Sequence, residues 1–195
     1  INDRGLLYKD YRIVPWCARC GTGLSSHELA QGYLDVKDLS VTAKFKIVGF
    51  DNAYFLAWTT TPWTLPGNVA LAVGADIEYV EIKVGEEILV LAKERLSVIA
   101  DPYEIIATHK GSEMVGMKYE PLYPFFSELA ASSQSLDTAF KVYVADFVTT
   151  EDGTGIVHIA PTFGADDARV AADAGVPGML VKDDKGNLVP LVDLQ

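Results

Sequence analysis

A stretch rich in hydroxyl groups is the first candidate for chemistry. Three consecutive threonines, Thr59, Thr60 and Thr61, end an apolar run and are followed at once by Pro62. Proline biases Thr61 toward an extended conformation and removes a backbone donor. Alternation along a strand puts Thr59 and Thr61 on one face and Thr60 on the other. For a single threonine β-propensity is the simpler explanation, but three at a strand end indicate a site lined with hydroxyls. With no His or Lys nearby in sequence, they form no activated nucleophile.

A second candidate combines a histidine with two carboxylates. His158 lies within a strand-like segment, and the helix expected soon after it opens with Asp166 and Asp167. A single histidine in a strand is more often a hydrogen-bonded structural residue than a catalyst. Aspartates in a first helical turn are explained by capping and by the helix dipole. One cap accounts for one aspartate, so the other could face a ligand, and a carboxylate beside a neutral histidine would bind an ammonium group.

The two cysteines of the chain form a third candidate. Cys17 and Cys20 have the C-x-x-C spacing of half a tetrahedral zinc site. Their flanks lack the βαβ pattern of a thioredoxin-like protein, and His27 and His109 are too isolated to complete a metal site. We therefore expect zinc at Cys17 and Cys20 only if further ligands come from outside this chain.

Composition and missing motifs exclude several classes of protein. The chain has 195 residues, 49% apolar and 22% charged, with a formal net charge of −11. This composition is globular rather than disordered, and no apolar run approaches the roughly 20 residues of a membrane span. Such an acidic chain should bind nucleic acid poorly by itself. No G-x-S-x-G, P-loop or H-E-x-x-H motif occurs, so covalent catalysis is not expected. The ends of the chain suggest a piece of a longer intracellular protein.

The elements that would position these residues are mostly short strands. Apolar residues alternate with polar ones over 41–47, as in a half-buried strand. Turn residues separate further expected strands at 53–60, 69–73, 77–84, 87–92, 103–108, 140–148 and 155–160. Helices are expected at 93–100 and at 165–174, the latter ending at Gly175, and residues 127–138 are expected to be a surface excursion with helical turns.

This order of elements predicts a β-rich α+β domain with few short helices, built round a barrel-like sheet. Residues 1–40 are expected to be a linker with the cysteine knuckle, residues 41–185 the main domain, and residues 186–195 a C-terminal linker.

Three segments of the chain resemble a known family. They are TTTPWTLPGN, starting at Thr59 and followed by VALAV, then GTGIVH, ending at His158, and GADD, ending at Asp167. Together they are similar to the editing (CP1) domain of isoleucyl-tRNA synthetases, a barrel-like class I synthetase editing fold. The resemblance covers nearly the whole chain, and the stretch before Cys17 resembles the linker from the catalytic Rossmann domain. Valyl and leucyl relatives carry a Thr-Arg-Pro variant, so Pro62 followed by Trp63 favours the isoleucyl member.

The resemblance implies hydrolysis of valine from the 3′ end of the tRNA for isoleucine, and also of valyl-adenylate. Isoleucine exceeds valine by one methylene, worth about 1–3 kcal/mol in an apolar pocket, a limit for which isoleucyl-tRNA synthetase is itself a standard example. A second site that admits valine and excludes isoleucine is therefore needed. The resemblance further implies a cytoplasmic, monomeric isoleucine–tRNA ligase, with ATP bound elsewhere in the full-length enzyme and no cofactor for editing.

Roles for individual residues follow from the same resemblance. Thr59, Thr60 and Thr61 should line the aminoacyl ester and its water. Trp63 and Asn68 should shape the pocket and hold the terminal adenosine. His158 should meet the ribose and the amino-acid side chain, Asp167 should bind the α-ammonium, and Asp166 should lie at the helix start. A positioned water and electrostatic support for the oxyanion would then be enough for hydrolysis.

Two other classes of function fit the same residues. One is a module that binds the tRNA acceptor end without hydrolysing it. The other is a free-standing aminoacyl-tRNA deacylase that acts in trans, against which the unpaired C-x-x-C half-site argues. Deacylation of mischarged tRNA distinguishes these classes.

Overall fold

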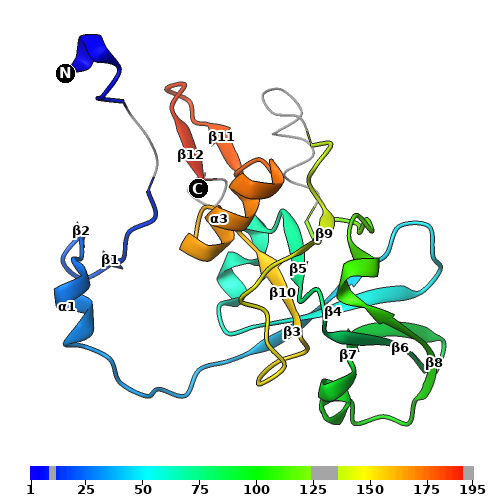
Figure 1. Cartoon of the computed structure of the whole chain (residues 1–195). Coiled ribbons are helices and arrows are strands. Elements are labelled where there is room, and N and C mark those ends of the chain that lie inside the picture. Colours follow the sequence, from blue (N-terminus) through cyan, green and yellow to red (C-terminus); the bar gives the residue numbers. More distant parts are fainter. Residues whose placement is uncertain (9–11, 124–135, 191–195) are drawn as a thin grey trace. The chain divides into compact units, whose positions relative to one another are not determined.

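The computed structural model describes residues 1–8, 12–123 and 136–190 of the chain (Figure 1). The chain forms two compact units, Ile1–Lys37 and Asp38–Gln195. The first unit contains the short elements η1 (Asn2–Arg4), β1 (Trp16–Cys17), β2 (Thr22–Gly23) and α1 (Ser26–Ala30). Helix α1 starts at a capping box, in which Ser25 and Glu28 each satisfy the other's backbone N–H group.

The second unit contains the predicted strands and helices. Its elements are β3 (Val41–Lys46), β4 (Ala53–Thr59), η2 (Pro62–Gly67), β5 (Ala70–Val73), β6 (Glu78–Val84), β7 (Glu87–Ala92), η3 (Lys93–Val98), β8 (Glu104–Lys110), η4 (Gly111–Met114), β9 (Lys141–Val144), β10 (Ile156–Ile159), α3 (Ala165–Ala174), β11 (Leu180–Lys182) and β12 (Leu188–Pro190).

These strands form separate mixed sheets. A five-stranded sheet has the order β3-β4-β7-β6-β8, a three-stranded sheet has the order β10-β5-β9, and β11 pairs with β12. Strand β4 is parallel to β7, and β5 is parallel to β9 but antiparallel to β10. The β-rich α+β fold with few short helices is confirmed. Among the described residues β3 and β8 remain edge strands, so the five-stranded sheet does not close into a barrel.

The two larger sheets pack face to face, and helices cover their outer faces. The core between the sheets joins Phe55 of β4, Leu71 and Val73 of β5, and Ile156 of β10. Helix α3 packs Val170 onto the other face of the three-stranded sheet, while η3 lies over the outer face of the five-stranded sheet. Strand β5 is buried on both faces, as its uninterrupted apolar sequence requires.

Most predicted strands are confirmed to within two residues, and α3 has the predicted bounds. Gly175 ends this helix in the left-handed conformation, with a φ of 64°. Two predictions were wrong in extent or type. Segment 140–148 is a strand only over β9, since Asp146 follows it in a turn. The expected helix at 93–100 is the 3₁₀ helix η3, which ends at Val98 and is followed by Ile99, two β-branched residues that disfavour an α-helix.

Other elements were not predicted. They are the hairpins β1–β2 and β11–β12 and the helices η1, α1, η2 and η4. Strand β12 lies inside segment 186–195, which we expected to be a linker. Most of the expected surface excursion at 127–138 lies outside the described residues. Within the described ranges, no helix combines the length and the apolar character needed to cross a bilayer.

Candidate functional site: a hydroxyl and histidine cluster

The threonine strand ends in a tight turn. Thr59 is the last residue of β4 and is buried, while Thr60 and Thr61 are exposed. The Thr61 N–H donates to Thr59 Oγ1 over 3.0 Å, which turns the chain away from the sheet. Pro62 then starts η2, where its missing N–H costs nothing. The predicted strand end is thus present, and a 3₁₀ turn follows it directly.

A chain of hydroxyl groups runs from this turn to His158. Thr59 Oγ1 lies 3.3 Å from Thr61 Oγ1, which lies 3.2 Å from Thr64 Oγ1. Thr64 also donates to the Thr61 carbonyl over 2.8 Å, and its Oγ1 lies 3.2 Å from His158 Nε2. The two sequence motifs, 94 residues apart at this contact, therefore meet in one connected cluster: Thr59, Thr61, Thr64 and His158, here called the hydroxyl cluster.

His158 is neutral at physiological pH. Only 6% of the residue is exposed, and burial lowers its pKa to about 4. Because the Thr64 proton points to the Thr61 carbonyl, the His158 contact is satisfied when Nε2–H donates to Thr64. That tautomer leaves Nδ1 as a buried acceptor, and Nδ1 has no hydrogen-bond partner in the described part of the chain. An acceptor of this kind suits a ligand hydroxyl or a water.

Sheet pairing and close backbone approach bring the two motifs together. His158 in β10 is opposite Leu71 of β5, and the Val69 N–H donates to the Ile159 carbonyl over 2.9 Å. Gly67 at the end of η2 faces the loop that follows β10, where a Cβ atom at position 67 would lie 2.7 Å from Phe163. A larger residue at position 67 would therefore force the Phe163 ring to move.

Asp167 is held at the end of the histidine strand. Its Oδ2 accepts a hydrogen bond from the Ala160 N–H over 2.9 Å. The carboxylate folds back over Gly164, where a Cβ atom would lie 2.8 Å from Asp167 Cγ. Burial raises the pKa of Asp167, opposed by the Ala160 N–H and assisted by Asp166. The N-cap of α3 is Gly164, with no capping side chain, so Asp167 joins the helix to β10 rather than capping it.

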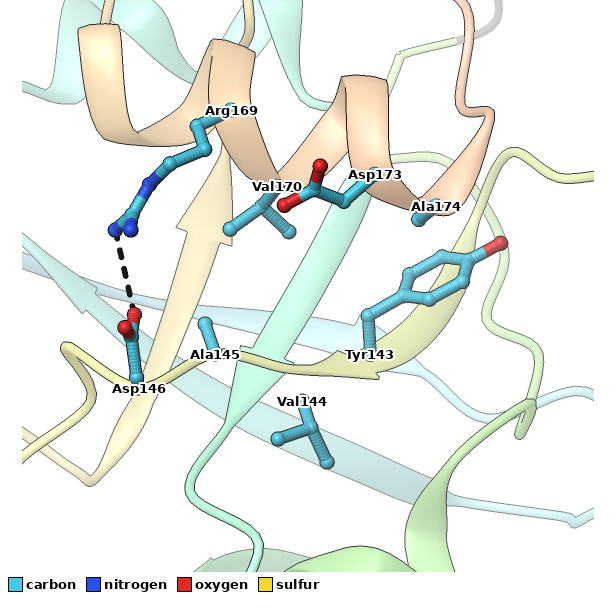
Figure 2. Close-up of a pocket in the computed structure, with 8 residues that line it drawn as sticks. All are labelled: Tyr143, Val144, Ala145, Asp146, Arg169, Val170, Asp173 and Ala174. Carbon is cyan, nitrogen blue, oxygen red and sulfur yellow. Dashed lines mark hydrogen bonds and ion pairs between the residues drawn. The ribbon is translucent and has the colours of Figure 1, made fainter.

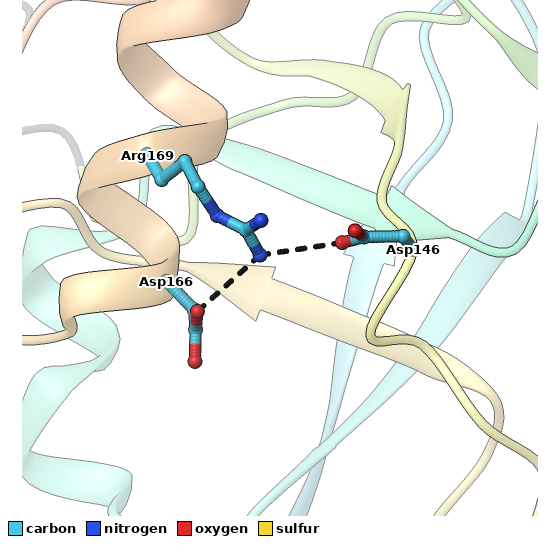
Figure 3. Close-up of polar contacts among 3 residues, drawn as sticks. All are labelled: Asp146, Asp166 and Arg169. Atoms are coloured by element: carbon cyan, nitrogen blue, oxygen red, sulfur yellow. Dashed lines mark hydrogen bonds and ion pairs between the residues drawn. The ribbon is translucent and has the colours of Figure 1, made fainter.

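Asp166 has a different environment. Its carboxylate is exposed and lies 3.3 Å from Arg169, which lies equally far from Asp146 at the end of β9 (Figure 3). Arg169, Asp146 and Asp173 line a cavity of about 320 Å³ between β9 and α3, floored by Val144 and Ala145 (Figure 2). Neighbouring aspartates in the sequence thus differ in burial and in partners.

The other predicted site residues do not join the hydrogen bonds of the hydroxyl cluster in the described part of the chain. Thr60 is exposed, and Trp63 in η2 is 61% exposed. Asn68 is only 4% exposed, and internal partners use its amide. Its Nδ2 donates to the Ala70 carbonyl, and its Oδ1 accepts from Tyr119 Oη over 2.6 Å. Asn68 therefore joins η2 to β5 from inside the core instead of facing an open pocket.

Sequence reasoning missed two hydroxyl groups near this site. Thr64 lies inside the quoted threonine motif and bridges Thr61 to His158. Its position three residues after Thr61 is the spacing that a 3₁₀ turn brings together, a signal that the proline could have given. Thr162 has a buried Oγ1 without a hydrogen-bond partner in the described residues, and it lies beside Gly67. No sequence pattern marks Thr162.

The cysteine pair lies in the first unit. Cys17 ends β1, the Cys20 N–H donates to Cys17 Sγ over 3.3 Å, and Gly21 adopts a φ of 68°. This N–H group chiefly lowers the pKa of Cys17. The turn supports Cys17 Sγ with a hydrogen bond that favours its thiolate form, which fits half of a zinc site. Among the described residues no group of three or more His, Cys, Asp or Glu is placed to hold a metal.

Known relatives match this chain over almost its whole length, although no family model matches it. The isoleucine–tRNA ligases of Clostridium tetani and Bacillus thuringiensis are 49% and 47% identical, each over 98% of this chain. The isoleucine–tRNA ligase of Cytophaga hutchinsonii is 47% identical over 222 residues. The chain spans only 18% to 19% of the length of these relatives.

The fold is also found in a solved structure. The crystal structure of GlLeuRS-CP1 superposes with a TM-score of 0.56 at 17% identity, covering 71% of this chain and 65% of that one. Identity of nearly one half across 98% of the chain, together with this shared fold, confirms the resemblance: the chain corresponds to an internal segment of isoleucine–tRNA ligases and has the fold of a synthetase CP1 domain.

Proposed function

We propose that this domain hydrolyses the ester between valine and the 3′-terminal adenosine of the tRNA for isoleucine, and also hydrolyses valyl-adenylate. The observation that carries the proposal is the hydroxyl cluster, in which Thr59, Thr61 and Thr64 reach a neutral, buried His158. Asp167 is anchored at the end of the same strand as His158. Hydroxyls, a neutral imidazole and one carboxylate match the polar groups of an aminoacyl ester.

The chemistry requires positioning rather than a strong base. An aminoacyl ester is already activated, so a water held by hydroxyl groups can attack it if the oxyanion finds donors. Thr60 and Thr61, exposed at the strand end, are assigned to the water and the ester. His158 cannot act as a cation near neutral pH, because its pKa is about 4. Its Nδ1 would instead accept a hydrogen bond from the ribose or the water.

Asp167 is assigned to the α-ammonium of the bound valine. Its Oδ2 already accepts the Ala160 N–H, whereas Oδ1 has no hydrogen-bond partner in the described chain. A carboxylate held by one oxygen presents the other in a fixed direction. The charge-assisted bond to an ammonium would contribute about 1.5–3 kcal/mol and would favour the ionised form against burial.

The remaining predicted residues take supporting roles. Trp63 is largely exposed beside the threonines and would stack on the terminal adenine. Asn68 would shape the pocket indirectly, through its bonds to Tyr119 and Ala70. Asp166 would add negative potential near the ammonium and at the start of α3.

The net charge of −11 implies that the rest of the synthetase holds most of the tRNA, so the domain alone should bind tRNA weakly. A small analogue of valyl-adenosine should still bind. We propose a monomeric cytoplasmic enzyme in which segments 1–40 and 186–195 connect residues 41–185 to the catalytic core. Editing would use no cofactor, and zinc at Cys17 and Cys20 would need ligands from elsewhere in the protein.

The test is deacylation by the full-length protein, using tRNA for isoleucine charged with valine, with threonine or with isoleucine. Rapid release of valine with isoleucine retained is expected. Removing the hydroxyl of Thr60 or Thr61 should slow release more than it lowers stability, and a larger apolar residue at either position should block even valine. Binding of the tRNA end without release would favour the binding module. Release by the separate chain, preferentially of threonine, would favour a deacylase acting in trans.

A further inference from the structure

Two neighbouring residues of η3 bind the loop that leads into the histidine strand: Glu94 accepts a hydrogen bond from the Thr150 hydroxyl, and Arg95 binds backbone carbonyl groups of the loop. Arg95 of η3 donates from Nε to the Gly153 carbonyl over 2.8 Å and from Nη1 to the Glu151 carbonyl over 3.0 Å, with the Thr150 carbonyl at 3.5 Å. One planar guanidinium thus reaches three carbonyl groups within a stretch of four residues. A lysine ammonium lacks this fork geometry and could not reproduce it.

The far end of the same loop is hydrogen-bonded to two strands of the five-stranded sheet. Thr154 inserts between β4 and β7, because its Oγ1 donates to the Leu56 carbonyl and its own carbonyl accepts the Ala92 N–H. Gly153 and Gly155 both have positive φ values, 67° and 74°, and a Cβ atom would lie 2.7 Å from Trp58 and 2.4 Å from Ala92, respectively. A side chain at either position would therefore be strained and would push the loop away from the sheet.

These hydrogen bonds of the loop fix the position of His158 relative to the threonines. Strand β10 begins at Ile156, directly after the loop, and His158 is its third residue. A shift of the loop is passed along the strand, because a paired strand moves as a unit. The contact from His158 Nε2 to Thr64 is 3.2 Å, so a displacement of a few tenths of an ångström would already exceed hydrogen-bond distance.

Arg95 makes no corresponding contribution to the core. Within the described residues its side-chain hydrogen bonds go to this loop, and its side chain lines a cavity of about 270 Å³ together with Trp58 and Asp152. Truncating Arg95 would therefore admit water rather than leave a closed void. Without Arg95 the domain should stay folded, but the loop should shift from its position.

We infer that Arg95 is a positioning residue for editing, which sets the contact between His158 and Thr64 through the Thr150–Gly155 loop. This inference rests on the proposed function. Misplacing catalytic groups by about 1 Å can cost roughly 100-fold in rate, so loss of Arg95 should lower the deacylation rate constant at saturating substrate and leave KM nearly unchanged.

The experiment compares Arg95→Ala, Arg95→Lys and Lys93→Ala in the full-length protein. Lys93 belongs to the same helix and carries the same charge, but its ammonium pairs with Glu78 on β6. For both Arg95 variants we expect deacylation of valyl-tRNA to slow by about tenfold or more, with KM and aminoacylation kept. Lys93→Ala should stay within about twofold, and millimolar guanidinium ion should restore part of the rate to Arg95→Ala.

Hydrogen exchange gives a readout that does not depend on activity. Arg95→Ala should accelerate exchange in peptides covering 150–159 and leave α3 unchanged. Normal deacylation by Arg95→Ala, or equal loss in Lys93→Ala, would overturn the inference, as would a rise in KM alone. If the wild-type protein releases no valine, the proposed function fails instead, and unaltered exchange in 150–159 would then overturn the positioning role separately.

Discussion

Two polar clusters each join a strand end to a neighbouring element of this domain, and they differ mainly in burial. The hydroxyl cluster joins η2 to β10 through Thr64 and the buried His158. The second, here called the surface ion cluster, joins β9 to α3 through Asp146, Arg169 and Asp166, all well exposed. Judged by formal charge alone, the surface ion cluster should hold its two elements together more firmly than the hydroxyl cluster does.

Because only the hydroxyl cluster is buried, its hydrogen bonds should contribute more to holding the fold than the exposed ion pairs do. An unpaired buried donor or acceptor costs about 1–3 kcal/mol, because water cannot replace its lost partner. Exposed ion pairs contribute about 0–1 kcal/mol, because water and salt screen them. Weak neutral bonds between Thr64 and His158 should therefore restrict the geometry more than the ion pairs of Arg169, and editing is proposed where the geometry is restricted.

The largest effect is expected from separating the two neighbouring aspartates. Asp167→Ala should leave the domain folded and slow release of valine by about 10- to 100-fold, the loss of a charge-assisted bond of 1.5–3 kcal/mol. Asp166→Ala should stay within about threefold, since its carboxylate is exposed and paired with Arg169. Deacylation kinetics and denaturant unfolding on both variants check this.

The opposite result would show that Asp167 is structural. Near-normal release of valine, together with lost stability in Asp167→Ala, would mean that its bond to the Ala160 N–H is its main role. Asp167→Asn is a useful second variant, because it keeps an acceptor for that N–H and removes only the charge.

The second effect concerns the bridge in the hydroxyl cluster. Thr64→Val keeps the shape but leaves His158 Nε2 and the Thr61 hydroxyl without this partner, so unfolding free energy should fall by about 1–3 kcal/mol and deacylation should slow as well. Thr60→Val should change stability by less than about 0.5 kcal/mol while still slowing deacylation. Equal stability of the two variants would remove the distinction between buried and exposed hydroxyls.

The third effect is the pH dependence that His158 imparts. Its pKa in the folded chain is about 4, below the ordinary value of 6.5. As pH falls below 6.5 the unfolded chain takes up a proton that the folded chain does not, so stability falls until about pH 4. Between pH 6.5 and pH 5 the loss should be about 1.6 kcal/mol.

Chemical denaturation at these two pH values measures this loss in the wild-type protein and in His158→Gln. The glutamine variant lacks the titrating group, so its stability should change less over the same interval. Identical pH dependence in the two proteins would mean that His158 is accessible to protons while folded.

The same contrast explains what could be predicted from the sequence. Local patterns specify the strands and helix α3, because alternation and Gly175 act over a few residues. The pairing of η2 with β10 depends on contacts across 94 residues, and no local pattern indicates that Thr64 would reach His158. Asp166 and Asp167 have equivalent positions in any capping argument. In the structure they differ because the Ala160 N–H lies close to the start of α3 and donates to Asp167.

The smallest effect tests the surface ion cluster itself. Arg169→Ala removes both ion pairs and leaves Asp146 and Asp166 as exposed like charges. Since both carboxylates are more than 70% exposed, the loss in unfolding free energy should stay below about 1 kcal/mol and shrink further in about 1 M salt, where the screening length is about 3 Å. Thermal unfolding at low and high salt measures both quantities. A loss above 2 kcal/mol that salt does not reduce would contradict the contrast between the clusters, because Arg169 would then fix α3 against β9 as firmly as Thr64 fixes η2 against β10.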